Sequence, residues 1–185
     1  MILKNSTVIL FFLVINIVTA SAQPFGKLVD PRDGQEYKTQ KIGKQVWMAQ
    51  NLNYRSAKSW CYNNDPSFCV KYGRLYTYPD AAKACPRGWH LPTENDWSTI
   101  LLQAKGDTNA LDLVEGGSTG FDVKLAGVRY DHGEFNHLGE YAYFWSRIRN
   151  SNDPAWVYVF TNNLPMANRI HSFPASGFSV RCVRY

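Results

Sequence analysis

Charged residues are scarce in this 185-residue sequence, and no apolar run long enough to span a membrane follows the first 22 residues. Charged side chains make up 19% of the sequence, against 45% hydrophobic and 15% aromatic residues. Disordered chains and coiled coils are richer in charge and poorer in aromatics, so both classes are excluded. The net charge of +5 falls short of the clustered basic excess of a nucleic-acid-binding protein, so we expect no nucleic-acid partner.

Long helices are also excluded, because thirteen glycines and nine prolines interrupt the sequence. Six Trp, eleven Tyr and ten Phe residues favour strands and loops. A glycine-rich nucleotide-binding loop is absent from the sequence. We therefore expect one compact domain over residues 23–185, with a β-rich or an α+β fold.

Residues 1–22 have the features of a signal peptide. Lys4 provides the positive start, residues 8–18 are apolar except for Asn16, and residues 20–22 are small. This apolar stretch is shorter than the roughly 20 residues that a membrane-spanning helix requires. A buried strand or a membrane anchor is the alternative interpretation. We expect the mature chain to be secreted or held at the cell surface, with no membrane span.

Four cysteines follow this segment, Cys61, Cys69, Cys85 and Cys182, and an oxidising compartment would allow them to pair. Four cysteines permit three pairings. The turn-forming residues 63–66 favour a bridge between Cys61 and Cys69, which leaves Cys85 to pair with Cys182. A four-cysteine zinc site is the alternative, but such sites usually contain Cys-x-x-Cys spacings, which this sequence lacks.

The spacing of apolar and turn-forming residues predicts the regular elements. Residues 23–35 favour a surface lead-in, and residues 37–42 and 45–49 favour a hairpin. Helical segments are expected at 79–85, from Thr93 to Gly106, and at 110–114, with Thr93 and Asp96 as a capping pair. Further strands are expected at 121–125, 141–146, 156–161 and 178–183.

Five motifs occur in order along the chain, at residues 46–54, 60–64, 72–76, 85–93 and 178–184 (VWMAQNLNY, WCYNN, YGRLY, CPRGWHLPT and FSVRCVR). Together they closely resemble the Fibrobacter succinogenes major paralogous domain, over about residues 29–185. The resemblance implies an exported bacterial protein. It also implies a C-type-lectin-like fold, similar to that of formylglycine-generating enzymes, in which two helices flank a twisted, mainly antiparallel sheet and the chain ends meet.

The bridge from Cys85 to Cys182 fits a disulfide-closed domain of this kind. Arg147 departs from the family pattern, which tends to place a small residue there, so a shared role for its loop is not carried over.

The sharpest enzyme hypothesis is an oxidase of the formylglycine-generating type, because residues 181–184 resemble a motif of that relative. Such chemistry needs an accessible cysteine thiolate. If all four cysteines are paired, none remains for it. Glu94 and Asp96 are two residues apart on the expected helix and share no face, so they do not suit acid–base catalysis. We expect no enzymatic activity and no cofactor.

Four potential metal ligands lie close together at Asp131, His132, Glu134 and His137. Carboxylates suit calcium and imidazoles suit zinc, so the mixture fits neither ion well. We interpret this segment as a solvated hairpin turn and expect no bound metal.

The C-terminal third combines aromatic and arginine side chains, which are enriched at recognition surfaces. The candidates for ligand binding are Trp145, Arg147, Arg149, Trp156, Tyr158 and Arg169, with Arg181 in the same region. Core packing is the alternative for the two Trp residues.

We predict a secreted, non-enzymatic recognition module that binds polysaccharide at a cell surface or plant wall. Binding should be sensitive to salt and weakened by Arg147→Ala or Arg169→Ala. The alternative is a protein-interaction or structural module of the cell envelope.

Overall fold

A computed structural model describes residues 25–104, 110–148 and 155–185 of the chain. The predicted signal peptide, residues 1–22, lies outside the described residues, as do Gly106 and Arg149. The described part contains three sheets and three α-helices, so the fold is α+β, one of the two classes that the composition predicted. None of the described helices combines the length and the apolar character needed to cross a bilayer.

The first sheet contains both the first and the last strand of the described chain. Its order is β1 (Gly26–Val29), β2 (Glu36–Ile42), β3 (Gln45–Met48) and β11 (Val183–Arg184), with every neighbouring pair antiparallel. β2 and β3 form the predicted hairpin, and Gly43 takes the positive φ of +59° that its tight turn requires. β1 lies in the expected lead-in and is mostly exposed, but it is an ordered strand at the sheet edge.

The second sheet has the order β10 (Asn168–His171), β9 (Trp156–Thr161), β8 (Tyr141–Trp145), β6 (Ala126–Arg129) and β7 (Phe135–Leu138). Its pairs are antiparallel except for β6 and β8, which run parallel. The strands expected at 141–146 and 156–161 are confirmed by β8 and β9. Instead of one sheet, the domain therefore has two main ones.

Helices α2 (Tyr78–Ala84) and α3 (Glu94–Gln103) confirm two of the predicted helical segments. The capping pair is also confirmed, because the Thr93 hydroxyl accepts from the backbone N–H of Asp96 while the Asp96 carboxylate accepts from that of Thr93. The expected segment at 110–114 is a 3₁₀ turn, η2 (Ala110–Leu113).

A third helix, α1 (Pro66–Tyr72), was not expected, and a second 3₁₀ turn, η1 (Tyr62–Asn64), precedes it. The Asp65 carboxylate caps α1 by accepting from the backbone N–H of Ser67 at 2.9 Å, and Pro66 takes the first helical position. The Asp65-Pro66 pair is also typical of a turn, and a turn is what the sequence predicts at residues 63–66. The expectation of two flanking helices is therefore wrong. A third, two-stranded sheet of β4 (Ser59–Trp60) and β5 (Leu75–Tyr76) brackets this helix.

The strand predicted at 121–125 does not form, although the alternation that suggested it is real. Phe121 and Val123 are fully buried, while Asp122 and Lys124 are partly exposed. Asp122 takes a φ of +61°, which breaks the extended conformation. Val123 instead makes an isolated bridge to Val114, and the strand begins only at Ala126.

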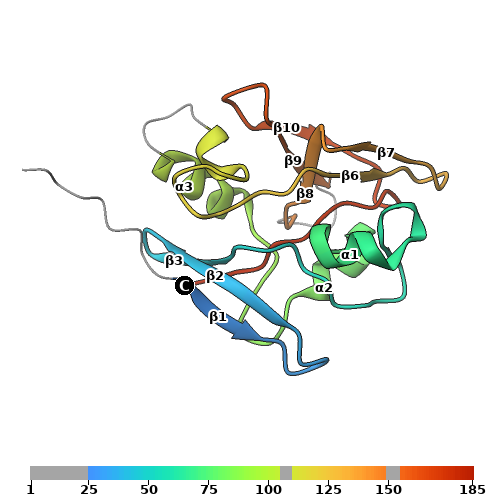
Figure 1. Cartoon of the computed structure of the whole chain (residues 1–185), viewed down its shortest axis with the longest axis horizontal. Coiled ribbons are helices and arrows are strands. Elements are labelled where there is room, and N and C mark those ends of the chain that lie inside the picture. Colours follow the sequence, from blue (N-terminus) through green and yellow to red (C-terminus); the bar gives the residue numbers. More distant parts are fainter. Residues whose placement is uncertain (1–24, 105–109, 149–154) are drawn as a thin grey trace, which may run out of the picture.

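The C-terminal segment, residues 177–184, runs through the centre of the molecule and binds both sheets (Figure 1). Phe178 pairs with Tyr76 of β5, and Ser179 pairs with Phe144 of β8. The carbonyl of Cys182 accepts from the backbone N–H of Met48 at 3.0 Å. The single strand predicted at 178–183 is therefore wrong, because this segment changes partners along its length. Side chains on both faces of the segment are buried, Cys182 on one face and Ser179, Arg181 and Val183 on the other.

Arg181 is fully buried in this segment, so its place in the predicted recognition region is corrected. Its guanidinium donates to the Asn51 side-chain oxygen at 2.9 Å, to the carbonyl of Asp122 at 2.6 Å and to the carbonyl of Phe121. The guanidinium also lies 4.4 Å from the centre of the Phe121 ring. Burial lowers the pKa of Arg181 to about 9, so the group is still charged at neutral pH.

Two disulfides close the domain in the pairing that the sequence favoured. Cys61 bonds to Cys69 within the α1 region, and Cys85 bonds to Cys182 across 97 residues. In the chain-entropy model the short bridge stabilises the fold by roughly 2–3 kcal/mol and the long one by roughly 4–5 kcal/mol. The long bridge fixes the C-terminal segment to the end of α2.

Asp96 is a buried carboxylate that joins α3 to the first sheet. It accepts from the Tyr185 hydroxyl at 2.6 Å, from Gln45 at 2.8 Å and from the Thr93 hydroxyl at 2.7 Å, and His90 lies 3.2 Å away. Burial alone would raise the pKa of Asp96, but hydrogen bonds from Tyr185, Thr93 and His90 outweigh it and lower the pKa.

A lowered pKa in the folded state means that ionised Asp96 stabilises the fold above its ordinary pKa near 3.8, and that this contribution is lost as the pH falls through the lower folded value. Asp96→Asn should destabilise the domain by about 2 kcal/mol at pH 7 and should flatten the decline in stability below pH 4. Urea unfolding across this pH range measures both effects, with the exposed Asp131→Asn as control. A decline in Asp96→Asn as steep as in the wild type would contradict the assignment.

Candidate functional site

Two of the predicted ligand-binding residues belong to the core. Trp145 is fully buried, and its indole N–H donates to the carbonyl of Tyr76 at 2.6 Å. Tyr158 is also buried, with its ring stacked on Trp97 of α3 at a centroid distance of 5.1 Å. Both side chains point from their strands into packed layers. The prediction that they form part of a ligand-binding surface is therefore corrected.

Trp156 and Arg169 do meet at the surface, on the neighbouring strands β9 and β10. The Arg169 guanidinium lies 4.0 Å from the centre of the Trp156 ring, and the His171 ring contacts the same indole. Glu94, the first residue of α3, forms an ion pair with Arg169. Arg169 is therefore partly occupied in holding β10 against α3, which leaves less of it for a ligand.

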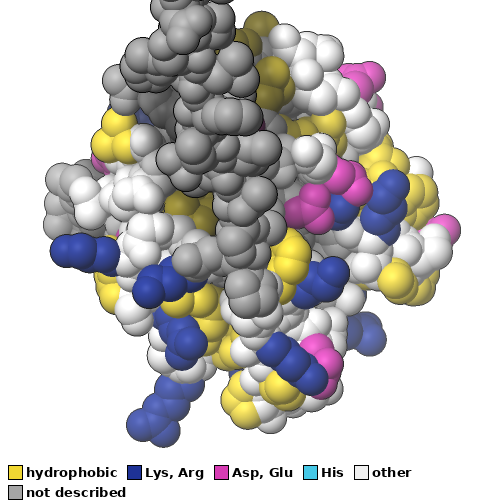
Figure 2. All heavy atoms as spheres, turned by 60° about the vertical axis from the view of Figure 1, so that its left-hand side comes forward, with side chains coloured by type: hydrophobic (Ala, Val, Ile, Leu, Met, Phe, Trp, Pro, Cys, Tyr) yellow, Lys and Arg dark blue, Asp and Glu magenta, His cyan; other side chains and the backbone are white. Residues whose placement is uncertain are grey.

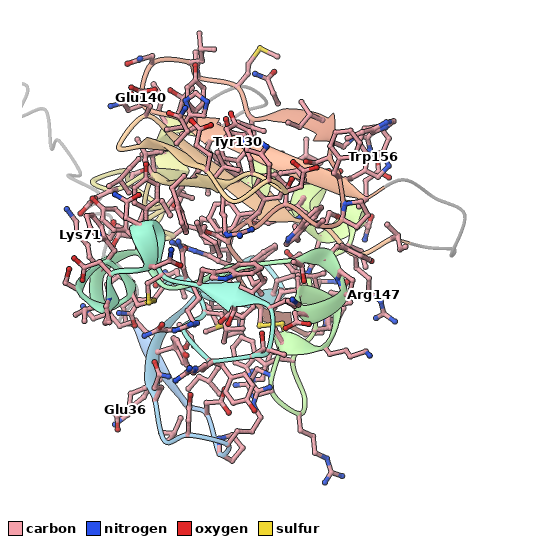
Figure 3. All side chains as sticks on the ribbon, turned by 90° about the vertical axis from the view of Figure 1, so that its right-hand side faces the viewer. Glu36, Lys71, Tyr130, Glu140, Arg147 and Trp156 are labelled. Carbon is pink, nitrogen blue, oxygen red and sulfur yellow. A yellow bond between two sulfur atoms is a disulfide. The ribbon has the colours of Figure 1, made fainter. Side chains whose placement is uncertain are left out.

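Arg147 is exposed and lies near Trp156 and Arg169. Its backbone N–H donates to the carbonyl of Pro92 at 2.7 Å, and the preceding Ser146 donates to the carbonyl of Trp156 at 2.9 Å. Figure 3 shows Arg147 and Trp156 on the same side of the molecule. We call the surface formed by Glu94, Arg147, Trp156 and Arg169 the Trp156 corner. Arg149, also predicted here, lies outside the described residues.

A groove of about 490 Å³ lies elsewhere, where β4, α2, β6 and the segment before residue 177 meet. Its volume is within the range of about 300–1,000 Å³ that is usual for small-molecule sites. Trp60, Pro79, Pro174 and Ala175 provide apolar surface. We call it the Trp60 groove.

Four charged side chains also line the Trp60 groove: Lys58, Asp80, Arg129 and Asp131. The Arg129 guanidinium stacks on the Trp60 indole at 3.9 Å, so it covers one face of the ring and is held in place there. One oxygen of Asp80 accepts from the backbone N–H of Lys58 at 2.7 Å. The two cations and two anions balance, so the groove combines flat apolar surface with hydrogen-bonding groups of both kinds and no net charge.

Sequence reasoning missed this groove because its residues come from four separate segments. Trp60 stands in a recognised motif, beside Cys61, and is the one signal that could have drawn attention to it. Arg129 and Asp131 reach the groove only because β6 pairs with Gly177 of the C-terminal segment. That pairing has no signature in the sequence.

The segment from Asp131 to His137 is a hairpin between β6 and β7, as expected. His132 lies 3.2 Å from Asp131 and 3.3 Å from Glu134, and hydrogen bonds to Glu134 and Asp131 raise the pKa of His132. His137 contacts Glu140 and the Tyr130 hydroxyl instead. Among residues 25–104, 110–148 and 155–185, no three histidine, cysteine or acidic side chains are arranged to hold a metal ion.

Figure 2 shows Lys and Arg side chains at several places on one face of the molecule, among apolar and uncharged surface, with several of them gathered at its lower left.

Comparison with protein families gave a match to the model described as Fibrobacter succinogenes major domain, over residues 41–184. The match includes both disulfides, the Trp60 groove and the Trp156 corner. Comparison with curated proteins and with solved structures gave no match.

The two Trp residues predicted as ligand contacts should differ in their effect on stability. Trp145→Ala should reduce the free energy of unfolding by about 3–5 kcal/mol, because it leaves a cavity in the core. Trp156→Ala should cost about 1 kcal/mol, because its indole is partly exposed. Urea denaturation of both variants measures the difference, and equal losses would contradict the assignment of Trp145 to the core and Trp156 to the surface.

Proposed function

This chain belongs to the Fibrobacter succinogenes major domain family, and we propose that it is a secreted, non-enzymatic recognition module that binds polysaccharide in the Trp60 groove. The observation that carries the proposal is the groove itself, with its indole, its guanidinium and its two carboxylates. The ligand would be a glycan of a cell surface or plant wall.

The groove suits a sugar because a pyranose ring has an apolar C–H face and a rim of hydroxyl groups. The two prolines and the part of the Trp60 indole that Arg129 leaves uncovered would contact the C–H groups, and Asp80 and Asp131 would accept hydrogen bonds from hydroxyls. Arg129 would donate to ring or hydroxyl oxygens from its fixed position on the indole. Because the lining charges balance, a neutral sugar fits it better than a charged one.

Export is part of the proposal. The first 22 residues have signal-peptide features, and disulfides of the kind seen here persist in oxidising compartments. The first and last described strands, β1 and β11, belong to one sheet, as its two edges, and this supports the C-type-lectin-like arrangement that the sequence resemblance implies.

Binding without turnover agrees with the chemistry of the described side chains. The oxidase alternative needs a thiolate, whereas all four cysteines are bonded and Cys182 is fully buried.

A protein-interaction module is the second candidate, and one observation favours it. Large apolar side chains are exposed on β10 and on the segments around it, at Leu164, Met166, Ile170 and Phe173. β10 is also an edge strand, which a partner chain could extend. None of these four side chains lines the Trp60 groove, although Phe173 directly precedes Pro174 in its lining.

Pull-down on insoluble cellulose, xylan and mannan, followed by calorimetry with soluble fragments of the polymer that binds, tests the proposed function. Trp60→Ala should weaken binding about tenfold, because it removes the flat apolar surface. Asp131→Asn, an exposed substitution that should preserve the fold, should weaken it about threefold.

Arg147→Ala and Arg169→Ala serve as matched variants at the Trp156 corner. If these two abolish binding while Trp60→Ala retains it, the site lies at the corner. Absence of binding to every polysaccharide would exclude the carbohydrate function and favour the protein-interaction module.

A further inference from the structure

A second pocket, of about 380 Å³, lies between β2, the segment that follows β3 and the end of α1. It shares no lining residue with the Trp60 groove. Figure 3 shows two of its residues, Glu36 on β2 and Lys71 on α1, on the side of the molecule opposite Arg147 and Trp156. Part of its lining comes from the motifs at residues 46–54 and 72–76, namely Ala49, Gln50, Asn51, Asn53 and Gly73.

The charges around this pocket do not balance, unlike those of the Trp60 groove. Of its acidic residues, Glu36 pairs with Lys27 at 2.5 Å and Asp122 pairs with Lys124 at 3.3 Å. Lys38 and Lys71 also line the pocket and are exposed, and neither forms an ion pair with any residue that the structure describes. The pocket therefore has two ammonium groups available for an anion.

The two ammonium groups are positioned by neighbouring rings. The Lys38 nitrogen lies 5.5 Å from the centre of the Phe25 ring, and the Lys71 nitrogen lies 5.0 Å from that of Tyr72. Cation–π contacts of this kind hold a charge in place without neutralising it. Each lysine thus retains N–H groups that can donate to an anion.

The lining also has amide groups with unused hydrogen-bonding capacity. The side-chain oxygen of Asn53 is enclosed and has no hydrogen-bond partner among the described residues, so it lies behind the pocket wall and does not face a ligand. The Gln50 oxygen accepts from the backbone N–H of Lys38 at 2.7 Å, which leaves the Gln50 amino group to donate. A ligand with a hydroxyl group beside its charged group would match the Gln50 amide.

We propose that this pocket binds a sugar acid, whose carboxylate would lie between Lys38 and Lys71 and whose hydroxyls would face the amide of Gln50. The inference goes beyond the proposed function and does not depend on it, because the Trp60 groove favours neutral sugars and is built from other residues. The chain would then bind two kinds of carbohydrate at two separate places.

Calorimetry with a trimer of galacturonic acid tests the second site. The wild type should bind this trimer, and it should bind a neutral galactose trimer and acetate at least about fivefold more weakly. Lys71→Gln should lower the affinity for the acidic trimer about fivefold, and the Lys38→Gln, Lys71→Gln double variant should lower it further. Lys83→Gln, an exposed change in the last turn of α2, is the matched control and should bind like the wild type.

Trp60→Ala separates this proposal from the first, because it should leave binding of the acidic trimer unchanged whether or not neutral polysaccharide binds. Three results would overturn the second site: no binding of the acidic trimer, equal binding of the neutral trimer or of acetate, or unchanged affinity in the double variant. A loss in Lys83→Gln as large as in Lys71→Gln would also overturn it, since it would indicate non-specific attraction to positive charge.

Discussion

A guanidinium can be buried in a protein only if other polar groups replace the water that it loses, and Arg181 sets this constraint for the whole domain. The side chain of Asn51 and the carbonyls of Phe121 and Asp122 supply the replacement oxygens. These oxygens come from two loops that are far apart in the sequence. The left-handed conformation of Asp122 allows two successive carbonyls to meet one guanidinium. The charge therefore fixes the path of both loops around the C-terminal segment.

The same segment builds the Trp60 groove. Gly177 exchanges backbone hydrogen bonds with Arg129 of β6, at 2.7 and 3.0 Å, and Phe178 does the same with Tyr76 of β5. A Cβ atom at Gly177 would lie 3.1 Å from the Cβ of Arg129, so the close approach favours glycine. Through these pairings the indole of Trp60 on β4 meets the guanidinium on β6. The candidate site thus depends on the central segment, although only its first residues lie near the groove.

Local patterns in the sequence predicted the local parts of the fold. The hairpin of β2 and β3 and the capping of α3 depend on residues whose conformational preferences act over a few positions. The two disulfides follow from the pairing of four cysteines. The predictions were wrong where contacts with residues distant in the sequence determine the backbone conformation or the burial of a side chain. Alternation at residues 121–125 indicated burial correctly but not the backbone, because Asp122 is turned toward Arg181. Trp145 and Trp156 are the same residue type on adjacent strands, and only the neighbouring layers make one core and the other surface.

Hydrogen exchange tests most directly whether the buried C-terminal segment holds the domain together. The amides of Met48, Leu52, Tyr76 and Phe178 all donate to or lie in this segment. These amides should exchange only through global unfolding. Their free energy of opening should equal the free energy of unfolding measured with denaturant, and it should be at least as large as that of the amides in β9. Exchange of these amides through a smaller, local opening, while β9 stays protected, would show that the segment is an attachment to the fold and not its centre.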